Sequence, residues 1–322
     1  MRQREFRYRR PRRSRGLFWV LLGLAGIGTA AVVLGERRRR SSAPDRPEES
    51  PSAQGFYPPE PPESVSVWLA GPAGNLYVRD GGKSEHVPIV FVHSLAGNGG
   101  QWALQLDHLR RRRRAVAFDL RGHGESDPAE DGDYSIAGLA TDVEAVADQL
   151  GMRRFILAGH SLGSVVAIEY ASRHPERVAG LLLVDPNGDL TRMPQDQKES
   201  FVGPLRQDPI GELTSYYRQL VVGGDADAAR WVLEDLRLTH EDAVLAALES
   251  SMEYPVIEAL GKYPGPKLAV VSDRNNLPYS LHRMLPELTA RLMTGTGHWL
   301  MMDRPELFNR IVDEFLEEVE GE

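Results

Sequence analysis

The segment RFILAGHSLGSVVAIEY, Arg154–Tyr170, constrains the fold of this chain more than any other. An apolar run of strand length leads directly into the turn sequence GHSLG and then into a helical pattern. Small residues on both sides of Ser161 permit a strained turn that exposes the hydroxyl, and the helix N-terminus behind it stabilises negative charge in front. A strand, a sharp turn and a helix in this order predict an α/β protein with a nucleophile at Ser161.

The chain from Val65 onward alternates short apolar runs with longer amphipathic segments, which predicts a mostly parallel sheet flanked by helices. The expected strands are VSVWLA, LYVRD, PIVFVH, AVAFDL, RFILAGH, GLLLVD, KLAVVSD and ARLMTG. Between GLLLVD and KLAVVSD, roughly seventy residues contain only helical patterns, too many for a plain loop. We therefore expect a helical lid over one edge of the sheet, at about residues 187–262 of a domain that spans 65–322.

The N-terminal part of the chain predicts a membrane anchor. Residues 16–35 are uncharged and about long enough to span a bilayer as a helix. Arginines are in excess in residues 1–15, so the N-terminus is expected in the cytoplasm and the domain outside the cell membrane. Residues 36–64 are rich in Pro, Ser and Glu and are expected to form a flexible linker. The alternative is a signal peptide cleaved near GTAA, which would release the protein.

Composition narrows the function classes. The chain has no cysteine, which excludes disulfides and thiolate metal sites, and it has no HExxH spacing. The net charge is -8 although the first forty residues are strongly basic, so the domain is acidic and not suited to binding nucleic acid. We expect no metal and no cofactor.

Four motifs follow the expected strands in a specific order: FVHSLAGNGGQW, DLRGHGESD, GHSLGS and GTGHWLMMDRPELFN. With these motifs the chain resembles the α/β-hydrolase superfamily over nearly all of residues 65–322. The resemblance implies an eight-stranded α/β-hydrolase fold and a serine hydrolase that cleaves a carboxylic ester or related acyl bond of a small-molecule substrate. It also implies that the reaction proceeds through an acyl-enzyme without a cofactor.

A serine hydroxyl needs a base within hydrogen-bond reach, and His298 in GTGHW matches the base of the family. By the same resemblance, the backbone amides of Leu162 and Leu95 form the oxyanion hole. The family usually has glycine where this chain has Ser94, whose hydroxyl either lies near the pocket or reshapes the loop. Three other histidines are expected to have structural roles: His93, His123 and His160.

The acid of the catalytic triad is the least clear member. In most relatives it follows the seventh strand, but the corresponding positions here are Asn275 and Asn276, whose amides cannot stabilise an imidazolium by charge. The known alternative in the family is the end of the sixth strand, where GLLLVD ends in Asp185. We expect Asp185 to be the acid, with Asp273 as its rival, and Asp189 or no acid at all as the remaining alternatives.

Other functions stay open at this point. Epoxide hydrolases and haloalkane dehalogenases use aspartate at the nucleophile position and are excluded by Ser161. Carbon-carbon bond hydrolases, lactonases, aminopeptidases and haloperoxidase-like enzymes also use serine. A different class of function, a non-catalytic ligand-binding or sensor protein, is suggested by the two amides after the seventh strand, and a scaffold for a membrane complex is the least favoured. The sequence does not predict an oligomeric state.

Overall fold

The computed structural model of the protein describes residues 64–83, 85–276 and 280–321. All of these residues belong to one compact unit, Pro44–Glu322. The predicted N-terminus 1–15, the membrane segment 16–35 and the linker, except Ser64, lie outside the described residues. Within the described ranges, no helix has both the length and the apolar character needed to cross a bilayer.

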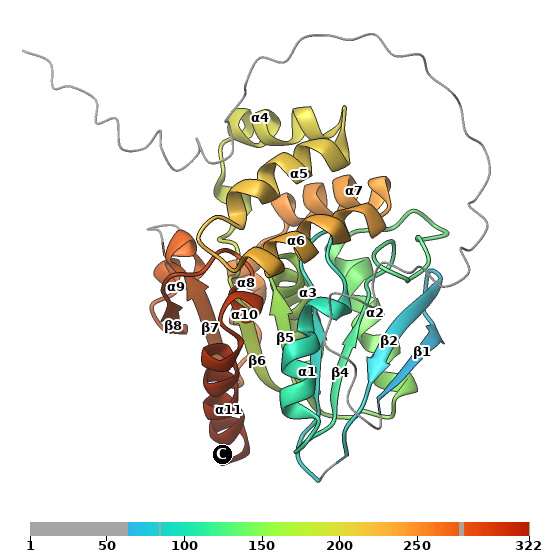
Figure 1. The fold of residues 1–322 in the computed structure, drawn as a ribbon, viewed down its shortest axis with the longest axis vertical. Coiled ribbons are helices and arrows are strands. Elements are labelled where there is room, and N and C mark those ends of the chain that lie inside the picture. Colours follow the sequence, from blue (N-terminus) through green and yellow to red (C-terminus); the bar gives the residue numbers. More distant parts are fainter. Residues whose placement is uncertain (1–63, 84, 277–279, 322) are drawn as a thin grey trace, which may run out of the picture. The chain divides into compact units, whose positions relative to one another are not determined.

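A single eight-stranded sheet forms the centre of the described domain, in the order β1-β2-β4-β3-β5-β6-β7-β8 (Figure 1). The strands are β1 Val65–Ala70, β2 Asn75–Asp80, β3 Ile89–Val92, β4 Ala115–Phe118, β5 Phe155–His160, β6 Val178–Val184, β7 Lys267–Ser272 and β8 Thr289–Met293. β2 pairs antiparallel with β1 and with β4, and all pairings from β4 to β8 are parallel. The predicted fold class, a mostly parallel eight-stranded sheet, is confirmed.

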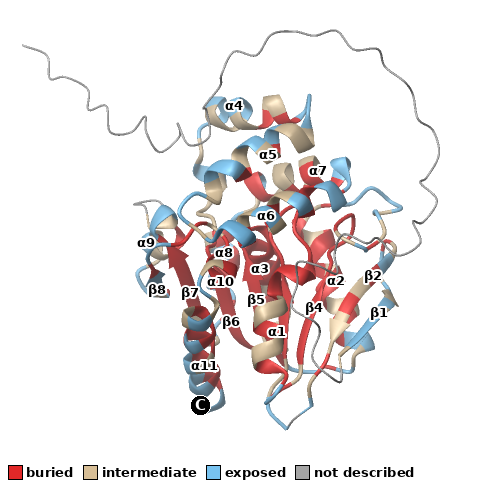
Figure 2. Ribbon diagram, viewed as in Figure 1, coloured by how far each residue is buried: buried red, intermediate tan, exposed pale blue. Residues whose placement is uncertain are grey.

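Helices cover both faces of the parallel part of the sheet (Figure 1). On one face lie α1 Ala103–Leu109, α10 Leu300–Asp303 and α11 Pro305–Gly321; on the other lie α2 Ile136–Gln149 and α3 Leu162–Arg173. All residues of β3, β5 and β6 are therefore buried, which is why these strands read as continuous apolar runs. β1, at one edge of the sheet, is largely exposed (Figure 2).

The chain between β6 and β7 is a helical insertion, residues 190–261 (Figure 1). Its elements are η3 Leu190–Arg192, α4 Gln195–Leu205, α5 Pro209–Leu220, α6 Ala226–Asp235, η4 Leu236–Leu238, α7 Glu241–Glu253 and α8 Val256–Gly261. The hydroxyl of Tyr217 in α5 donates a hydrogen bond to the carbonyl of Leu95, in the loop after β3. The insertion thus lies against a loop at the carboxyl end of the sheet, where parallel α/β proteins bind ligands.

Candidate active site

Ser161 lies at the junction between β5 and α3, in a strained backbone conformation with φ of 52° and ψ of -113°. The glycines beside it are required by space. A Cβ on Gly159 would lie 2.1 Å from the carbonyl oxygen of Gly163, and a Cβ on Gly163 would lie 2.5 Å from the carbonyl oxygens of Val92 and His93. The turn is therefore tightly packed against the end of β3 and holds Ser161 in one position at the start of α3.

Asp185 and His298 are brought together from distant parts of the chain. Asp185 is the first residue after β6, and its Oδ2 lies 2.6 Å from Nδ1 of His298. Ser272, the last residue of β7, adds two hydrogen bonds to the carboxylate: its amide donates to Oδ1 at 2.8 Å and its hydroxyl donates to Oδ2 at 3.0 Å. The contact between Asp185 and Nδ1 fixes the orientation of the His298 imidazole ring, so Nε2 is the nitrogen that can accept a proton.

The other carboxylates considered from the sequence make different contacts. Asp273 is exposed, and its Oδ2 accepts a hydrogen bond from the amide of Gly295 at 3.0 Å. Asp189 caps the short helix η3. Asn275, at the position where most relatives have the acid, donates from Nδ2 to the carbonyl of Pro186 at 2.6 Å. Of the candidate acids, Asp185 is thus the one that contacts His298.

The two amides expected to bind an oxyanion belong to neighbouring segments. Leu162 is the first residue of α3, and the close approach of Gly163 to the end of β3 places this helix turn beside the loop that contains Leu95. In the same loop, Ala96 has a φ of 49°, a value that non-glycine residues adopt only when their surroundings enforce it. We call residues 94–97 the oxyanion loop below.

The side chain of Ser94 is turned into the oxyanion loop. It is fully buried, and its hydroxyl lies 3.4 Å from the carbonyl oxygen of Leu95 and 3.5 Å from Oε1 of Gln101. The contact with Gln101 favours the alternative in which the Ser94 side chain reshapes the loop over the one in which it adds a hydroxyl near the pocket.

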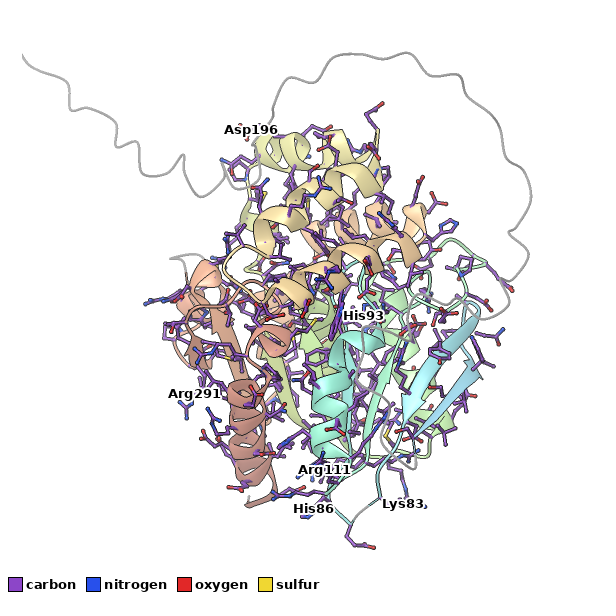
Figure 3. The ribbon with its side chains drawn as sticks, viewed as in Figure 1. Lys83, His86, His93, Arg111, Asp196 and Arg291 are labelled. Carbon is purple, nitrogen blue, oxygen red and sulfur yellow. The ribbon has the colours of Figure 1, made fainter. Side chains whose placement is uncertain are left out.

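His93 forms a hydrogen bond to the backbone of the same loop. Its Nδ1 donates to the carbonyl of Ser94 at 2.7 Å, and its Nε2 accepts from the amide of Leu120 at 2.9 Å. Burial lowers the pKa of His93 to about 4, so the ring is neutral at pH 7, as this donor and acceptor pattern requires. Figure 3 shows His93 beneath the helical insertion. Burial likewise lowers the pKa of His123 to about 3.

His160 contacts the backbone of the segment that carries the expected base. Its Nε2 donates to the carbonyl of His298 at 2.9 Å, and the two rings lie 4.6 Å apart. Burial, followed by the nearby His298, lowers the pKa of His160, which keeps its ring uncharged. His160 therefore packs beneath His298 and holds its backbone.

Three residues that the sequence did not single out contact the site. Ser272 holds Asp185, Tyr217 contacts Leu95, and Gln101 contacts Ser94. Nothing in the sequence identifies the partners of Ser272 and Tyr217, because these two contacts join segments that are far apart in the chain.

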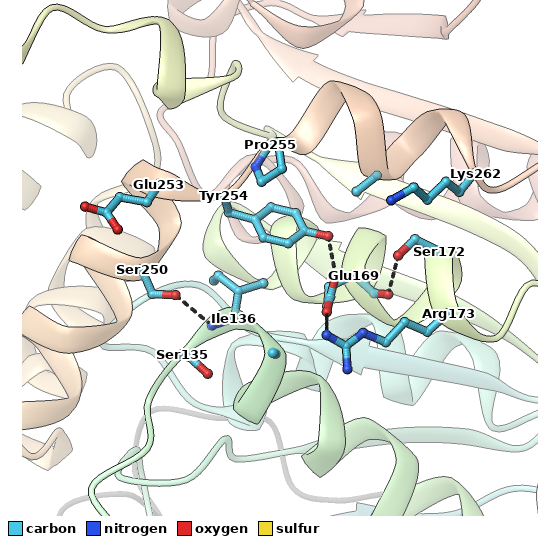
Figure 4. A pocket seen from close by; sticks show the side chains of 12 residues that line it. Ser135, Ile136, Glu169, Ser172, Arg173, Ser250, Glu253, Tyr254, Pro255 and Lys262 are labelled. Carbon is cyan, nitrogen blue, oxygen red and sulfur yellow. Dashed lines mark hydrogen bonds and ion pairs between the residues drawn. The ribbon is translucent and has the colours of Figure 1, made fainter.

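A surface hollow of about 390 Å³ lies elsewhere, between α2, α3 and the end of α7 (Figure 4). In it the Tyr254 hydroxyl donates to Oε2 of Glu169 at 2.5 Å, and Arg173 forms an ion pair with the same carboxylate. The residues lining this hollow do not include Ser161, Asp185 or His298. Within the described ranges, no group of three or more His, Asp or Glu side chains is arranged to hold a metal ion.

Comparison with known proteins gives the class of the molecule. A family model described as alpha/beta hydrolase fold matches residues 87–247, half of the 322-residue chain. This chain belongs to the α/β-hydrolase family, and it is an enzyme of the hydrolase type that characterises this family.

Its relatives include enzymes with several named activities. The chain is 25% identical over 266 residues to a putative 2-succinyl-6-hydroxy-2,4-cyclohexadiene-1-carboxylate synthase of Bacillus subtilis, covering 74% of this chain and 93% of the relative. It is 38% identical over 109 residues to the (lyso)-N-acylphosphatidylethanolamine lipase of Homo sapiens, covering 33% of this chain and 32% of the lipase. A solved enzyme described as degrading N-acyl homoserine lactones is 25% identical, with a TM-score of 0.68 over 77% of this chain and 100% of that enzyme.

Proposed function

We propose that this enzyme is a serine hydrolase that cleaves a carboxylic ester or a lactone through an acyl-enzyme. Ser161 Oγ attacks the carbonyl carbon while His298 Nε2 takes the hydroxyl proton and passes it to the oxygen of the broken C–O bond, which leaves as an alcohol from an ester or stays attached to the acyl chain as a hydroxyl from a lactone. Water then attacks the acyl-enzyme and gives a proton to His298, which returns it to Ser161 as the carboxylic acid is released. Asp185 orients the imidazole and stabilises the imidazolium formed in both steps.

The observation that carries this proposal is the 2.6 Å contact between Asp185 Oδ2 and His298 Nδ1, in a domain whose Ser161 occupies a strained turn at a helix N-terminus. The amides of Leu95 and Leu162 are the proposed oxyanion donors, because the end of β3 and the start of α3 lie against each other there. An acyl bond to oxygen is favoured as the target because the relatives include a lipase and a lactone-degrading enzyme.

The nucleophile is tested with a fluorophosphonate probe, which labels activated serines. We expect labelling of the wild type and loss of labelling in Ser161→Ala, together with a fall of about 10⁴-fold or more in kcat on an acyl-ester panel of varied chain length. Ser172→Ala, on the same helix but with a hydroxyl that donates to the carbonyl of Glu169, is the matched control. Folded wild type that neither reacts with the probe nor hydrolyses esters and lactones would contradict the proposal.

We also propose that residues 16–35 anchor the enzyme in the cell membrane, with the N-terminus in the cytoplasm and the hydrolase domain outside. The support is the uncharged stretch and the arginine excess before it. The full chain should stay in the membrane fraction after alkaline carbonate washing, whereas a chain starting at Ser41 should not. Protein recovered outside the cell with a new N-terminus near Ala31 would instead show a cleaved signal peptide.

A further inference from the structure

Gln101 is a buried amide that contacts three separate segments of the domain. It lies in the short helix η2 Gly99–Trp102 and is 1% exposed. Its Oε1 accepts a hydrogen bond from Nε1 of Trp299 at 3.2 Å and lies 3.5 Å from the hydroxyl of Ser94. Its Nε2 donates to Oδ2 of Asp235 at 2.9 Å. One side chain thus touches the oxyanion loop, the residue after His298 and the helical insertion.

The residues of the helical insertion that take part in these contacts are buried. Asp235 ends α6 and is 5% exposed. Tyr217 of α5 lies with its ring 4.8 Å from that of Trp299, while its hydroxyl donates to the carbonyl of Leu95. Burial strongly raises the pKa of Tyr217, so its hydroxyl keeps the proton that it donates. Two helices of the insertion therefore bind the loop, one directly and one through Gln101.

The oxyanion loop is built around the Gln101 side chain. A Cβ on Gly97 would lie 2.6 Å from Oε1 of Gln101, so only glycine allows the loop backbone to approach the amide this closely. The next residue back, Ala96, is held at its positive φ. A backbone in such a conformation persists only when neighbouring groups fix it. Besides the hydrogen bond from the Gly97 amide to the Ser94 carbonyl at 3.1 Å, the neighbours of this turn are Gln101, which lies against Gly97, and Tyr217, which bonds to Leu95.

We propose that Gln101 is a positioning residue that couples the helical insertion to the oxyanion loop, and so aims the Leu95 amide at the oxyanion. This inference rests on the proposed hydrolase function. Negative charge on the substrate oxygen develops fully only in the transition state, so a misaimed donor reduces kcat more than it changes KM. Ser94 belongs to the same arrangement, because its hydroxyl lies against Gln101 where a glycine would leave the position empty.

The test compares two buried glutamines. Gln105 in α1 is as buried as Gln101, but its Nε2 donates to the carbonyl of Met301 and to Oδ1 of Asn309, away from the loop. Q101M and Q105M each replace a buried carboxamide by an apolar chain of similar size, and we expect both to lower Tm. Only Q101M should lower kcat, by about ten- to a hundred-fold with KM changed less than about three-fold, since one oxyanion donor is worth that much or more.

A second variant acts from the insertion. D235L removes the acceptor for Gln101 and should lower kcat in the same range. The Q101M/D235L double variant should be no slower than the slower single variant, because the two changes break one coupling. D235N keeps an acceptor oxygen and should restore most of the kcat. For each of these variants, the affinity for a trifluoromethyl ketone, which forms an oxyanion when it binds, should fall by the same factor as kcat/KM.

Several outcomes would overturn the inference. They are equal kcat losses in Q101M and Q105M, a Q101M effect confined to KM, or a double variant whose losses multiply. If Q101M does not fold, the D235L and D235N pair decides: equal kcat in both overturns the coupling. Wild-type turnover that depends on Ser161 establishes the proposed function independently, whereas absence of turnover in the wild type would overturn both.

Discussion

The ends of β6 and β7 are neighbours in the sheet, and each is followed directly by an aspartate, yet the two carboxylates have different environments. Asp185 after β6 is 1% exposed and is surrounded by three hydrogen-bond donors, one of them on His298. Asp273 after β7 is exposed and accepts from the amide of Gly295. The same residue type at equivalent strand ends is therefore directed to His298 in one case and to a turn in the other.

The difference comes from the backbone after each strand. Asp185 has a φ of 44°, which turns its side chain toward the end of β7, where Ser272 and His298 donate to it. After β7 the chain instead enters a short helical turn, η5 Asp273–Asn275, capped by the Ser272 side chain. A carboxylate at the end of a parallel strand thus becomes a partner for the base only if the following residues turn it inward. Four variants test this contrast, beginning with the largest expected effect.

Asp185→Asn should lower kcat by about 10⁴-fold, because an amide cannot stabilise the imidazolium and favours the wrong tautomer of His298. KM should change little, and the folded state should persist because an amide can keep some of the hydrogen bonds to Ser272. Steady-state kinetics on the best ester substrate measure the effect. A loss of less than about ten-fold would mean that another group serves as the acid.

Ser272→Ala removes the hydroxyl that donates to Asp185 Oδ2 but leaves the backbone amide that donates to Oδ1. We expect kcat to fall by about ten-fold, equivalent to one hydrogen bond of roughly 1.4 kcal/mol. Ser280→Ala is a poor control because this residue contacts Asn275, so Ser172→Ala on α3 is preferred. Unchanged kcat in Ser272→Ala would show that the amide alone holds the carboxylate.

Asn275→Asp places a carboxylate where most relatives have their acid. It removes the donor to the Pro186 carbonyl, so the free energy of unfolding should fall by about 1–3 kcal/mol in denaturant titrations. When Asn275→Asp is added to Asp185→Asn, kcat should rise by less than about three-fold, because the side chain at position 275 faces Pro186 rather than His298. Restoration of a hundred-fold or more would show that the end of β7 can still supply the acid.

Asp273→Asn should have the smallest effect. An amide oxygen can still accept from Gly295, and exposed substitutions of this kind usually change stability by less than about 0.5 kcal/mol. We expect kcat within about two-fold of wild type across the pH range of activity. A loss comparable to that of Asp185→Asn would reverse the assignment of the two strand ends.

The sequence was sufficient for the fold because its strongest signals are local. Apolar runs such as GLLLVD mark buried strands, and GHSLG between a strand and a helix marks the turn at Ser161. The preference for Asp185 over Asp273 as partner of His298 came from the resemblance to the family, in which the end of the sixth strand is the known alternative place of the acid, and the structure has that contact. The catalytic roles themselves stay predictions until the variants are measured.

The supporting residues could not be predicted, for a physical reason. Ser272, Gln101 and Tyr217 form hydrogen bonds with Asp185, Asp235 and Leu95, which are 87, 134 and 122 residues away in the chain. Neither the position of Ser272 at a strand end nor that of Gln101 within FVHSLAGNGGQW indicates so distant a partner, so only the folded chain reveals what each one contacts. The histidines predicted as structural were easier to interpret, since His93 and His123 lie in loops that follow strands and His160 is the last residue of β5.

The helical insertion begins and ends on adjacent strands, because β6 and β7 pair in parallel register from Leu181 with Lys267 to Val184 with Val270. Asp185 lies before the insertion, directly after β6, and Ser272 is the last residue of β7, so the hydrogen bonds between them join the two strand ends that flank the insertion. The sheet would therefore keep its pairing if this stretch were exchanged for another of different length. The domain is modular in its chain path: the helices of residues 190–261 are inserted between two neighbouring strand ends, whereas Ser161, Asp185 and His298 lie on segments outside them.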